Sequence, residues 1–230
     1  YKSLLSCAWG RPSEAFGPFY ERFDGPRRVP RLPGLPYHFM TRVVDTHGPI
    51  GGMQVGTRVV VEYDVPKDAW YFEENAARVM PYSVLLEVAL QPCGWLASYV
   101  GSAVQGDVDL YFRNLDGKGR VLGEVKPDSG TITVTSEITN ISRAGSMIIE
   151  SFKISVMLEA ASSKSPEIRK LAARLLPERL ASKMLFDPMT SVRCAAARRL
   201  PYGMLKESVK KFPGDDQLRS IARSKKITEA

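Results

Sequence analysis

Residues 70–95 read WYFEENAARVMPYSVLLEVALQPCGW, and this stretch decides the fold. Apolar residues recur in it at the spacing of one helical face, as at Val84, Leu85, Val88 and Ala89. Pro81 suits the first turn of a helix, so the pattern predicts one long helix over residues 81–100. Pro92 lacks an N–H and clashes with the preceding turn, which predicts a kink or an interruption inside that helix.

Six other stretches have the composition of β-strands, since they are rich in β-branched and aromatic residues. They cover residues 37–45, 57–64, 108–113, 119–126, 130–141 and 146–158. The fifth, TITVTSEITNIS, alternates with period two and can pair with the sixth through the turn RAG at 143–145. One long helix and an antiparallel meander predict an α+β domain whose sheet wraps around the helix.

Residues 1–36 are rich in Gly, Pro and Arg and show no clear periodicity. Their prolines recur too often for a helix or a central strand. We therefore predict an extended arm that lies across a neighbouring surface. Its expected anchors are the aromatic residues Phe16, Phe19, Tyr20 and Phe23. Because the chain starts at Tyr1 rather than Met, we expect it to be processed or only partly represented.

Four motifs carry a resemblance to a known family: LPGLPYHFM at 32–40, DAWYF at 68–72, LQPCGW at 90–95 and FRNL at 112–115. Over about residues 8–158 the chain resembles the β-hydroxyacyl-carrier-protein dehydratases. It is most similar to the dehydratase-like halves of polyunsaturated fatty acid (polyketide-type) synthases. The resemblance implies a hot-dog fold over residues 37–158, in which an antiparallel sheet wraps around one long central helix.

The resemblance also implies a reaction and its partners. The substrate would be a β-hydroxyacyl chain on a phosphopantetheine arm, and the product would be the trans-2-enoyl thioester. A second hot-dog unit would complete a homo- or heterodimer, and an acyl carrier protein would deliver the substrate to an active enzyme. Neither a cofactor nor a metal ion is expected.

Two positions of the chain correspond to the catalytic pair of that family. A His in the loop before the helix removes the α-proton there, and an Asp or Glu on the helix assists departure of the hydroxyl group. In this chain Asn75 stands at the histidine position and Glu87 at the acid position. An amide has no titratable proton near neutral pH, so a general-base contribution of about 10²–10⁴-fold would be lost. We therefore expect the chain to be inactive alone.

Two interpretations of Glu87 remain open. Apolar neighbours suggest partial burial, which favours a protonated carboxyl group and suits a proton donor. Alternatively, Glu87 is a structural carboxylate that is bonded to a backbone N–H or to an Arg. If it completes a composite site with a His of a partner unit, Gln91 would help to position the thioester. His38 is either a displaced base or substrate-channel contact, or a structural histidine bonded to a backbone group, and we favour the structural role.

Residues 159–230 differ in character from the rest. Residues 161–230 carry 16 Lys+Arg against 7 Asp+Glu, whereas residues 1–160 have a net charge of −2. The segment RKLAARLLP at 169–177 recurs as RCAAARRLP at 193–201, with an offset of 24 residues. Self-similarity at a fixed period marks a solenoid. The pattern resembles the leucine-rich repeat variant, with HEAT-like repeats as second choice, and predicts a short, basic, all-α repeat segment.

Basic side chains of this segment could form a stripe, namely Arg169, Lys170, Arg174, Arg193, Arg198 and Arg199. Such a stripe could bind RNA phosphates, dock onto an acidic protein, or be no more than a solvated face. Together with the missing base, the segment motivates a second hypothesis. The chain would then be a scaffold subunit of a larger assembly, which could be organellar or contain RNA.

Composition narrows the class of protein. A hydrophobic fraction of 44% is large enough for a core, and there is no run of eighteen apolar residues that would span a membrane. The three cysteines are widely spaced, with no CxxC and no Cys/His cluster. We expect no zinc site and a reducing, intracellular compartment, either the cytoplasm or an organelle matrix.

Overall fold

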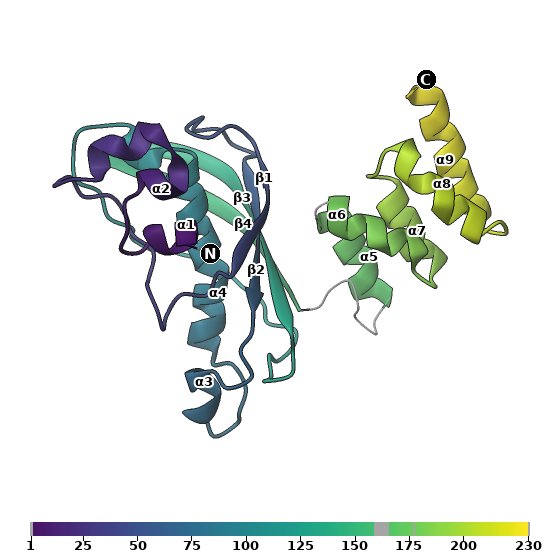
Figure 1. Cartoon of the computed structure of the whole chain (residues 1–230), viewed down its shortest axis with the longest axis horizontal. Coiled ribbons are helices and arrows are strands. Elements are labelled where there is room, and N and C mark those ends of the chain that lie inside the picture. Colours follow the sequence, from purple (N-terminus) through teal and green to yellow (C-terminus); the bar gives the residue numbers. More distant parts are fainter. Residues whose placement is uncertain (1, 159–165, 177, 230) are drawn as a thin grey trace. The chain divides into compact units, whose positions relative to one another are not determined.

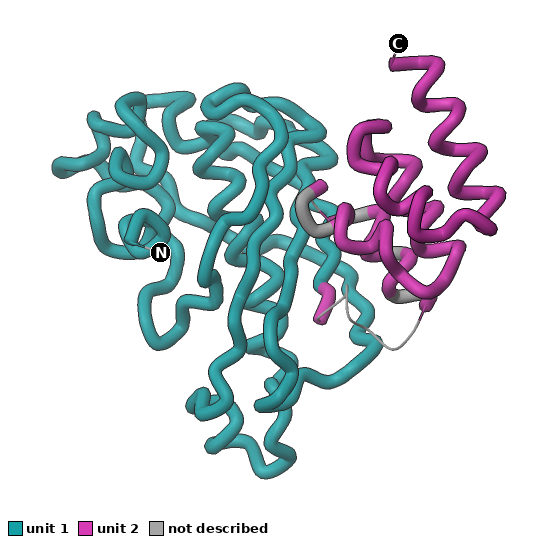
Figure 2. The backbone as a smooth tube through the Cα atoms, turned by 45° about the vertical axis from the view of Figure 1, so that its right-hand side comes forward, with its two compact units in different colours: residues 1–156 teal, residues 157–230 magenta. Residues whose placement is uncertain are grey.

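The computed structural model describes residues 2–158, 166–176 and 178–229. The chain divides into two compact units, residues 1–156 and 157–230 (Figure 2). Each unit has a core of its own, built from different buried residues. The two units are therefore described separately.

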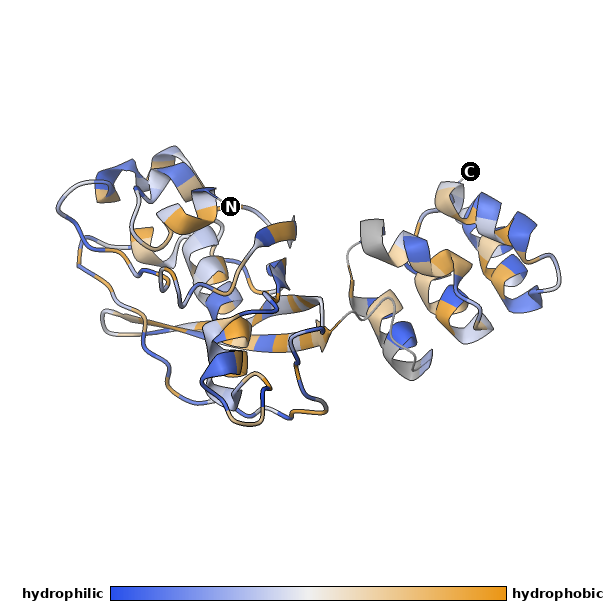
Figure 3. Cartoon of the chain, turned by 60° about the horizontal axis from the view of Figure 1, so that its bottom comes forward, coloured by the Kyte–Doolittle hydropathy of each residue, from blue (hydrophilic) through white to orange (hydrophobic). Residues whose placement is uncertain are grey.

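A four-stranded antiparallel sheet with the order β1-β2-β3-β4 forms one layer of the first unit (Figure 1). Its strands are β1 (Arg42–His47), β2 (Arg58–Asp64), β3 (Thr131–Ala144) and β4 (Met147–Leu158). The register of β2 and β3 runs from Arg58↔Glu137 to Asp64↔Thr131, and a β-bulge lies between Val43 and Asp45 in β1. Hydrophilic and hydrophobic residues both occur along the strands (Figure 3), and in β3 they alternate with the predicted period of two.

Helix α4 (Tyr82–Tyr99) lies against β2 and β3. Its Leu96 is fully buried in one core cluster with Val59, Val61 and Ile138 of these strands. The predicted long helix and four of the predicted strands are thus confirmed, and the unit is of the α+β class. The predicted interruption at Pro92 is wrong, because α4 continues through this residue. Proline removes a single backbone hydrogen bond, and burial of the helix face outweighs that loss.

The first part of the predicted arm, residues 2–23, is largely helical rather than extended, contrary to the prediction. It forms α1 (Lys2–Ser6), α2 (Ser13–Phe16) and the 3₁₀ helix η1 (Pro18–Phe23). Proline did not prevent these helices because it precedes α2 and opens η1, where its missing N–H costs nothing. The helices are short, and the remaining prolines Pro26, Pro30, Pro33 and Pro36 lie in the connection from η1 to β1.

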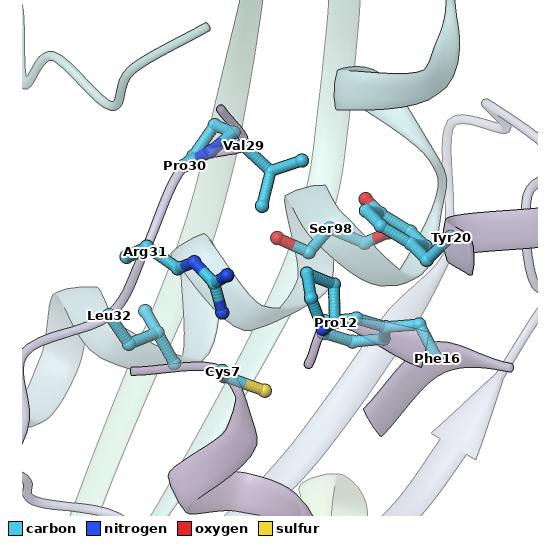
Figure 4. A pocket seen from close by; sticks show the side chains of 9 residues that line it. All are labelled: Cys7, Pro12, Phe16, Tyr20, Val29, Pro30, Arg31, Leu32 and Ser98. Atoms are coloured by element: carbon cyan, nitrogen blue, oxygen red, sulfur yellow. The ribbon is translucent and has the colours of Figure 1, made fainter. Parts of the chain in front are cut away.

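The aromatic residues of this segment pack on α4. Phe16 lies 5.6 Å from Trp95 between ring centroids, and the hydroxyl of Tyr20 donates to the carbonyl of Ser98 at 2.8 Å. Figure 4 shows Phe16, Tyr20 and Ser98 around a cavity of about 10 Å³, which is room for about one water molecule. Arg31, at the same cavity, donates to the carbonyls of Ser6 and Gly10 at 3.0 and 2.7 Å. The segment therefore belongs to the core of the first unit.

The two predicted strands at 108–113 and 119–126 are absent. Residues 107–126, all of them described, form neither helix nor strand, and Leu115 and Leu122 are exposed there. Arg27 and Arg28 hold the start of this segment through Asp107 at 2.9 Å and Tyr111 at 2.6 Å. Strand composition produces a strand only where another strand offers a backbone to pair with, and no described strand pairs with this segment.

The second unit is helical. Its described elements are α5 (Pro166–Leu175), α6 (Glu178–Ala181), the 3₁₀ helix η3 (Ser182–Phe186), α7 (Thr190–Ala197), α8 (Tyr202–Lys211) and α9 (Asp216–Thr228). Small buried residues such as Ala172, Ala196 and Ala222 let these helices approach closely around Leu200 and Leu205. In the part of the chain that the structure describes, no helix is both long and apolar enough to cross a bilayer.

Candidate functional site

Asn75 lies in the loop between α3 (Trp70–Glu73) and α4. Its Nδ2 donates to the carbonyl of Val79 at 2.7 Å, and its Oδ1 accepts from the backbone N–H of Ala77 at 3.3 Å. Its own carbonyl accepts from the N–H of Arg78 at 2.8 Å, where φ is +50°. Both ends of the amide are therefore used to hold the loop in a turn, and neither end can take up a proton at neutral pH.

Glu87 is half-buried on α4. The flank of the helix beside it is open, because Tyr82 and Leu86 are 61% and 41% exposed. The carboxylate has neither a hydrogen bond nor an ion pair with any other residue that the structure describes. The structural interpretation, in which a backbone N–H or an Arg binds this group, therefore has no partner among the described residues.

Gln91 follows one turn later on α4 and is only 2% exposed. Its Oε1 accepts from the N–H of Phe39 at 2.8 Å, and its Nε2 donates to the carbonyl of Tyr37 at 2.8 Å. The side-chain amide thus pairs with one backbone N–H and one backbone carbonyl of the segment before β1, as a neighbouring strand would. Both polar groups of this side chain bind the protein backbone. The thioester contact expected from the sequence would require these hydrogen bonds to break.

His38 is buried between the residues that Gln91 binds. Its Nδ1 lies 3.1 Å from the carbonyl oxygen of Pro33, and the ring also contacts the backbone of Met40. Burial lowers the pKa of the imidazole, although these backbone contacts partly oppose that change, so the ring is neutral at neutral pH. The backbone bonding is what the structural interpretation of this histidine expects.

The same histidine lines an open cavity of about 610 Å³ in the first unit. Asn75, Glu87 and Gln91 are not part of the lining. The structure therefore does not bring His38 and Glu87 together at one cavity. Gln91 binds the backbone on either side of His38, whereas the side chain of Asn75 bonds within its own loop.

A pair of tyrosines in the lining of this cavity was not predicted from the sequence. The hydroxyls of Tyr63 and Tyr71 are 3.0 Å apart, and both side chains are buried. Burial, and next the bond to Tyr63, raise the pKa of Tyr71 far above its usual value. The residues are eight positions apart on β2 and α3, and no local pattern in the sequence shows that their hydroxyls meet.

Arg193 of the basic segment is only 4% exposed. Its Nε and Nη2 donate to Oδ2 of Asp215 at 2.9 and 2.5 Å, and the remaining N–H groups reach the carbonyls of Asp187 and Pro188 and the hydroxyl of Thr190. The guanidinium carbon also lies 4.0 Å from the ring centroid of Phe212. Every N–H of this guanidinium group has an acceptor inside the protein.

Two more of the predicted docking residues have internal partners. Arg169 binds both carboxylate oxygens of Asp187 at 2.6 and 3.1 Å, and Arg199 donates to the carbonyls of Ala173 and Leu176 near the end of α5. The other three are the exposed Arg174 and Arg198 and the half-buried Lys170. Half of the predicted stripe thus stabilises the fold of the second unit.

Candidate metal ligands and thiols are described for residues 2–158, 166–176 and 178–229. No group of three or more His, Cys, Asp or Glu side chains in these ranges could hold a metal ion. All three cysteines are buried free thiols. Burial raises the pKa of Cys7 and of Cys93 to about 12, so neither is a nucleophile at neutral pH.

These features define an α+β unit in which one long helix lies on an antiparallel sheet, and the helix carries a carboxylate that has no partner among the described residues. Comparison with known proteins gives a relative: the chain is 31% identical over 164 residues to a polyunsaturated fatty acid synthase subunit of Thraustochytrium sp. (strain ATCC 26185 / S-3). The match covers 64% of this chain and 11% of that synthase subunit, so the chain spans a small part of its relative's length. No protein-family model matches the chain.

Proposed function

We propose that residues 37–158 form a hot-dog unit derived from the β-hydroxyacyl dehydratases, and that this unit does not dehydrate thioesters by itself. The observation that carries the proposal is the amide of Asn75. It stands where the resemblance expects a histidine base, and both of its ends are bonded within the loop. The similarity to a fatty acid synthase subunit supports the ancestry and a relation to fatty acid or polyketide synthesis.

The arrangement of α4 on the sheet supports the hot-dog assignment. The helix contacts both β2 and β3 and is the longest in the described chain. A hot-dog unit would surround such a helix with more sheet than the four described strands supply.

In this proposal Glu87 keeps a role only beside a second hot-dog unit. The exposed side chains of Tyr82 and Leu86 beside it offer an apolar surface for such a partner. A histidine of the partner would supply the missing base, and an acyl carrier protein would bring the β-hydroxyacyl chain.

A hydration assay tests the proposal. The full chain is incubated with the crotonyl thioester of N-acetylcysteamine, and loss of the enoyl absorbance is followed. We expect the rate to equal that of buffer, and Glu87→Gln to leave it unchanged. A rate above buffer that Glu87→Gln abolishes, while the exposed Glu124→Gln does not, would show a working site and overturn the proposal.

A second candidate function is that of a scaffold subunit, and the charge of the second unit favours it. Residues 161–230 carry a net charge of +9. Once the internally bonded arginines are set aside, Arg174 and Arg198 remain as exposed members of the predicted stripe. They would meet RNA phosphates or an acidic protein in a larger assembly.

Salt-dependent binding of single-stranded RNA tests the scaffold function. The pair Arg174→Gln and Arg198→Gln should reduce the slope of log affinity against log salt by about 0.7 per lost phosphate contact. The matched pair Arg113→Gln and Arg120→Gln removes the same charge from exposed positions of the first unit. Equal slopes for the two double variants would exclude this surface as an RNA contact.

A further inference from the structure

The open cavity of about 610 Å³ in the first unit has a lining of its own. One wall is the segment before β1, with Leu35, His38 and Met40, and the other is formed by the end of β2 and the start of α3. Its volume falls in the range of small-molecule pockets. Its lining residues are separate from Asn75 and Glu87, so ligand binding in this cavity does not depend on the proposed function.

Several contacts hold the two walls apart at a defined spacing. The indole Nε1 of Trp70 lies 3.4 Å from the carbonyl of Pro36, and the Trp70 ring stacks on Tyr37 at 5.8 Å between centroids. At the other end, the hydroxyl of Thr41 accepts from the N–H of Asp64 at 3.0 Å. The cavity is therefore framed by hydrogen bonds and ring contacts and is preformed, as ligand pockets usually are.

The lining combines apolar and aromatic side chains with a few neutral polar groups. The uncharged polar groups of the lining include the hydroxyls of Tyr63 and Tyr71, which bond to each other, and the neutral imidazole of His38. Neutral groups of this kind can orient a hydroxyl or carbonyl of a ligand without the large desolvation cost of a buried ion.

Charge at the rim decides which ligands are excluded. The lining contains two carboxylates, Asp64 and Asp68, and neither Lys nor Arg. Arg42 binds both carboxylate oxygens of Asp64 at 2.6 Å, which neutralises that group. The exposed Asp68 remains as a negative charge at the opening. A phosphate or carboxylate ligand would therefore be repelled and would find no cation in the lining.

We propose that this cavity binds a small uncharged molecule with an apolar or aromatic body and one hydroxyl or carbonyl group. Octan-1-ol is a probe of this class, and octanoate is its anionic counterpart of equal chain length. Octan-1-ol should bind at least tenfold more tightly than octanoate at neutral pH.

The indole N–H resonance of Trp70 provides the readout, because its donor lies at the edge of the cavity. Each probe is titrated into the full chain, and the indole signals of Trp9, Trp70 and Trp95 are followed by NMR. We expect octan-1-ol to shift the Trp70 signal with saturation. The signals of Trp9 and Trp95, which do not line the cavity, should stay in place.

Two variants test the site itself. Ala69→Leu fills part of the cavity from its wall and should weaken octan-1-ol binding at least tenfold. Asp68→Lys reverses the charge at the opening and should strengthen octanoate binding several-fold, whereas Asp128→Lys makes the same charge change at an exposed residue outside the lining. An unshifted Trp70 signal, equal affinities for both probes, or unchanged binding in Ala69→Leu would each overturn the proposal.

Discussion

Gln91 in the first unit and Arg193 in the second perform the same structural task by different chemistry. Both are almost fully buried, at 2% and 4% exposure, and both bind backbone carbonyls of segments distant in sequence or outside their own helix. The neutral amide of Gln91 has only backbone partners, whereas the cation of Arg193 is also paired with the carboxylate of Asp215. The comparison shows that a polar residue predicted to have a function can instead have its polar atoms bonded within the fold.

The largest expected effect comes from Arg193. Arg193→Met leaves Asp215 as a buried carboxylate without its cation and should lower the free energy of unfolding by about 3–5 kcal/mol. Denaturant unfolding followed by helical circular dichroism measures this loss.

Arg198→Met is the matched control for Arg193→Met. It removes the same charge from the same region at an exposed position and should change stability by less than about 0.5 kcal/mol. Equal losses in the two variants would mean that the buried ion pair does not stabilise the second unit. Adding Asp215→Asn to Arg193→Met should recover part of the loss, because the unpaired charge is then gone while an oxygen remains to accept from the N–H of Leu218.

Gln91→Leu should have the next largest effect. It leaves the N–H of Phe39 and the carbonyl of Tyr37 without their partner and should cost about 2 kcal/mol. No ion is stranded, which is why the loss is smaller than at Arg193. Thermal unfolding is compared with that of Gln54→Leu, an exposed position that should be neutral. If Gln91→Leu lowered the free energy of unfolding as much as Arg193→Met, the buried ion pair and the neutral amide would not differ in their contribution to stability.

Asn75→Asp tests whether the loop bonds of the amide matter. The variant keeps the oxygen that accepts from Ala77 but loses the donor to the carbonyl of Val79, so we expect a loss of about 1 kcal/mol. Asn114→Asp introduces the same change at an exposed position and serves as control in the same unfolding experiment. If both variants are equally stable, Asn75 is not held in the loop as described.

Glu150 on β4 should show the smallest effect, and its sign depends on pH. Burial raises the pKa of this carboxyl group, although the hydroxyl of Ser102 donates to it. The folded state therefore keeps the proton more tightly than the unfolded state, and stability falls as pH rises above the ordinary pKa of a glutamate. Glu150→Gln should be slightly stabilising at pH 7 and lose this advantage at pH 4. A constant difference between the two pH values would contradict the burial argument.

Several elements of the fold could be predicted from local patterns. The helix predicted over 81–100 is α4 (Tyr82–Tyr99), and four of the predicted strands correspond to β1–β4. These elements could be predicted because the periodicity of their apolar residues matches the faces that they bury against each other. The predicted strands within 107–126 have the same composition but no described strand beside them, and this is information that no local window contains.

The candidate site was harder to predict from the sequence than the fold was. The residue types at Asn75, Glu87 and Gln91 were readable, but the partners of their side chains were not. The hydroxyl pair of Tyr63 and Tyr71 depends on how the end of β2 meets α3, and the ion pair of Arg193 depends on a residue 22 positions later. Contacts of this kind are set by the meeting of whole elements rather than by neighbours in the chain.

By itself, the sequence determined the long helix α4, the four strands of the sheet and the concentration of basic charge in residues 161–230. Tertiary structure alone decided which polar groups are still available for chemistry. The physical reason is that a buried donor or acceptor must be satisfied by whatever group packing brings near it. Packing satisfied Gln91 and Arg193 within the fold, while Glu87 has no partner among the described residues.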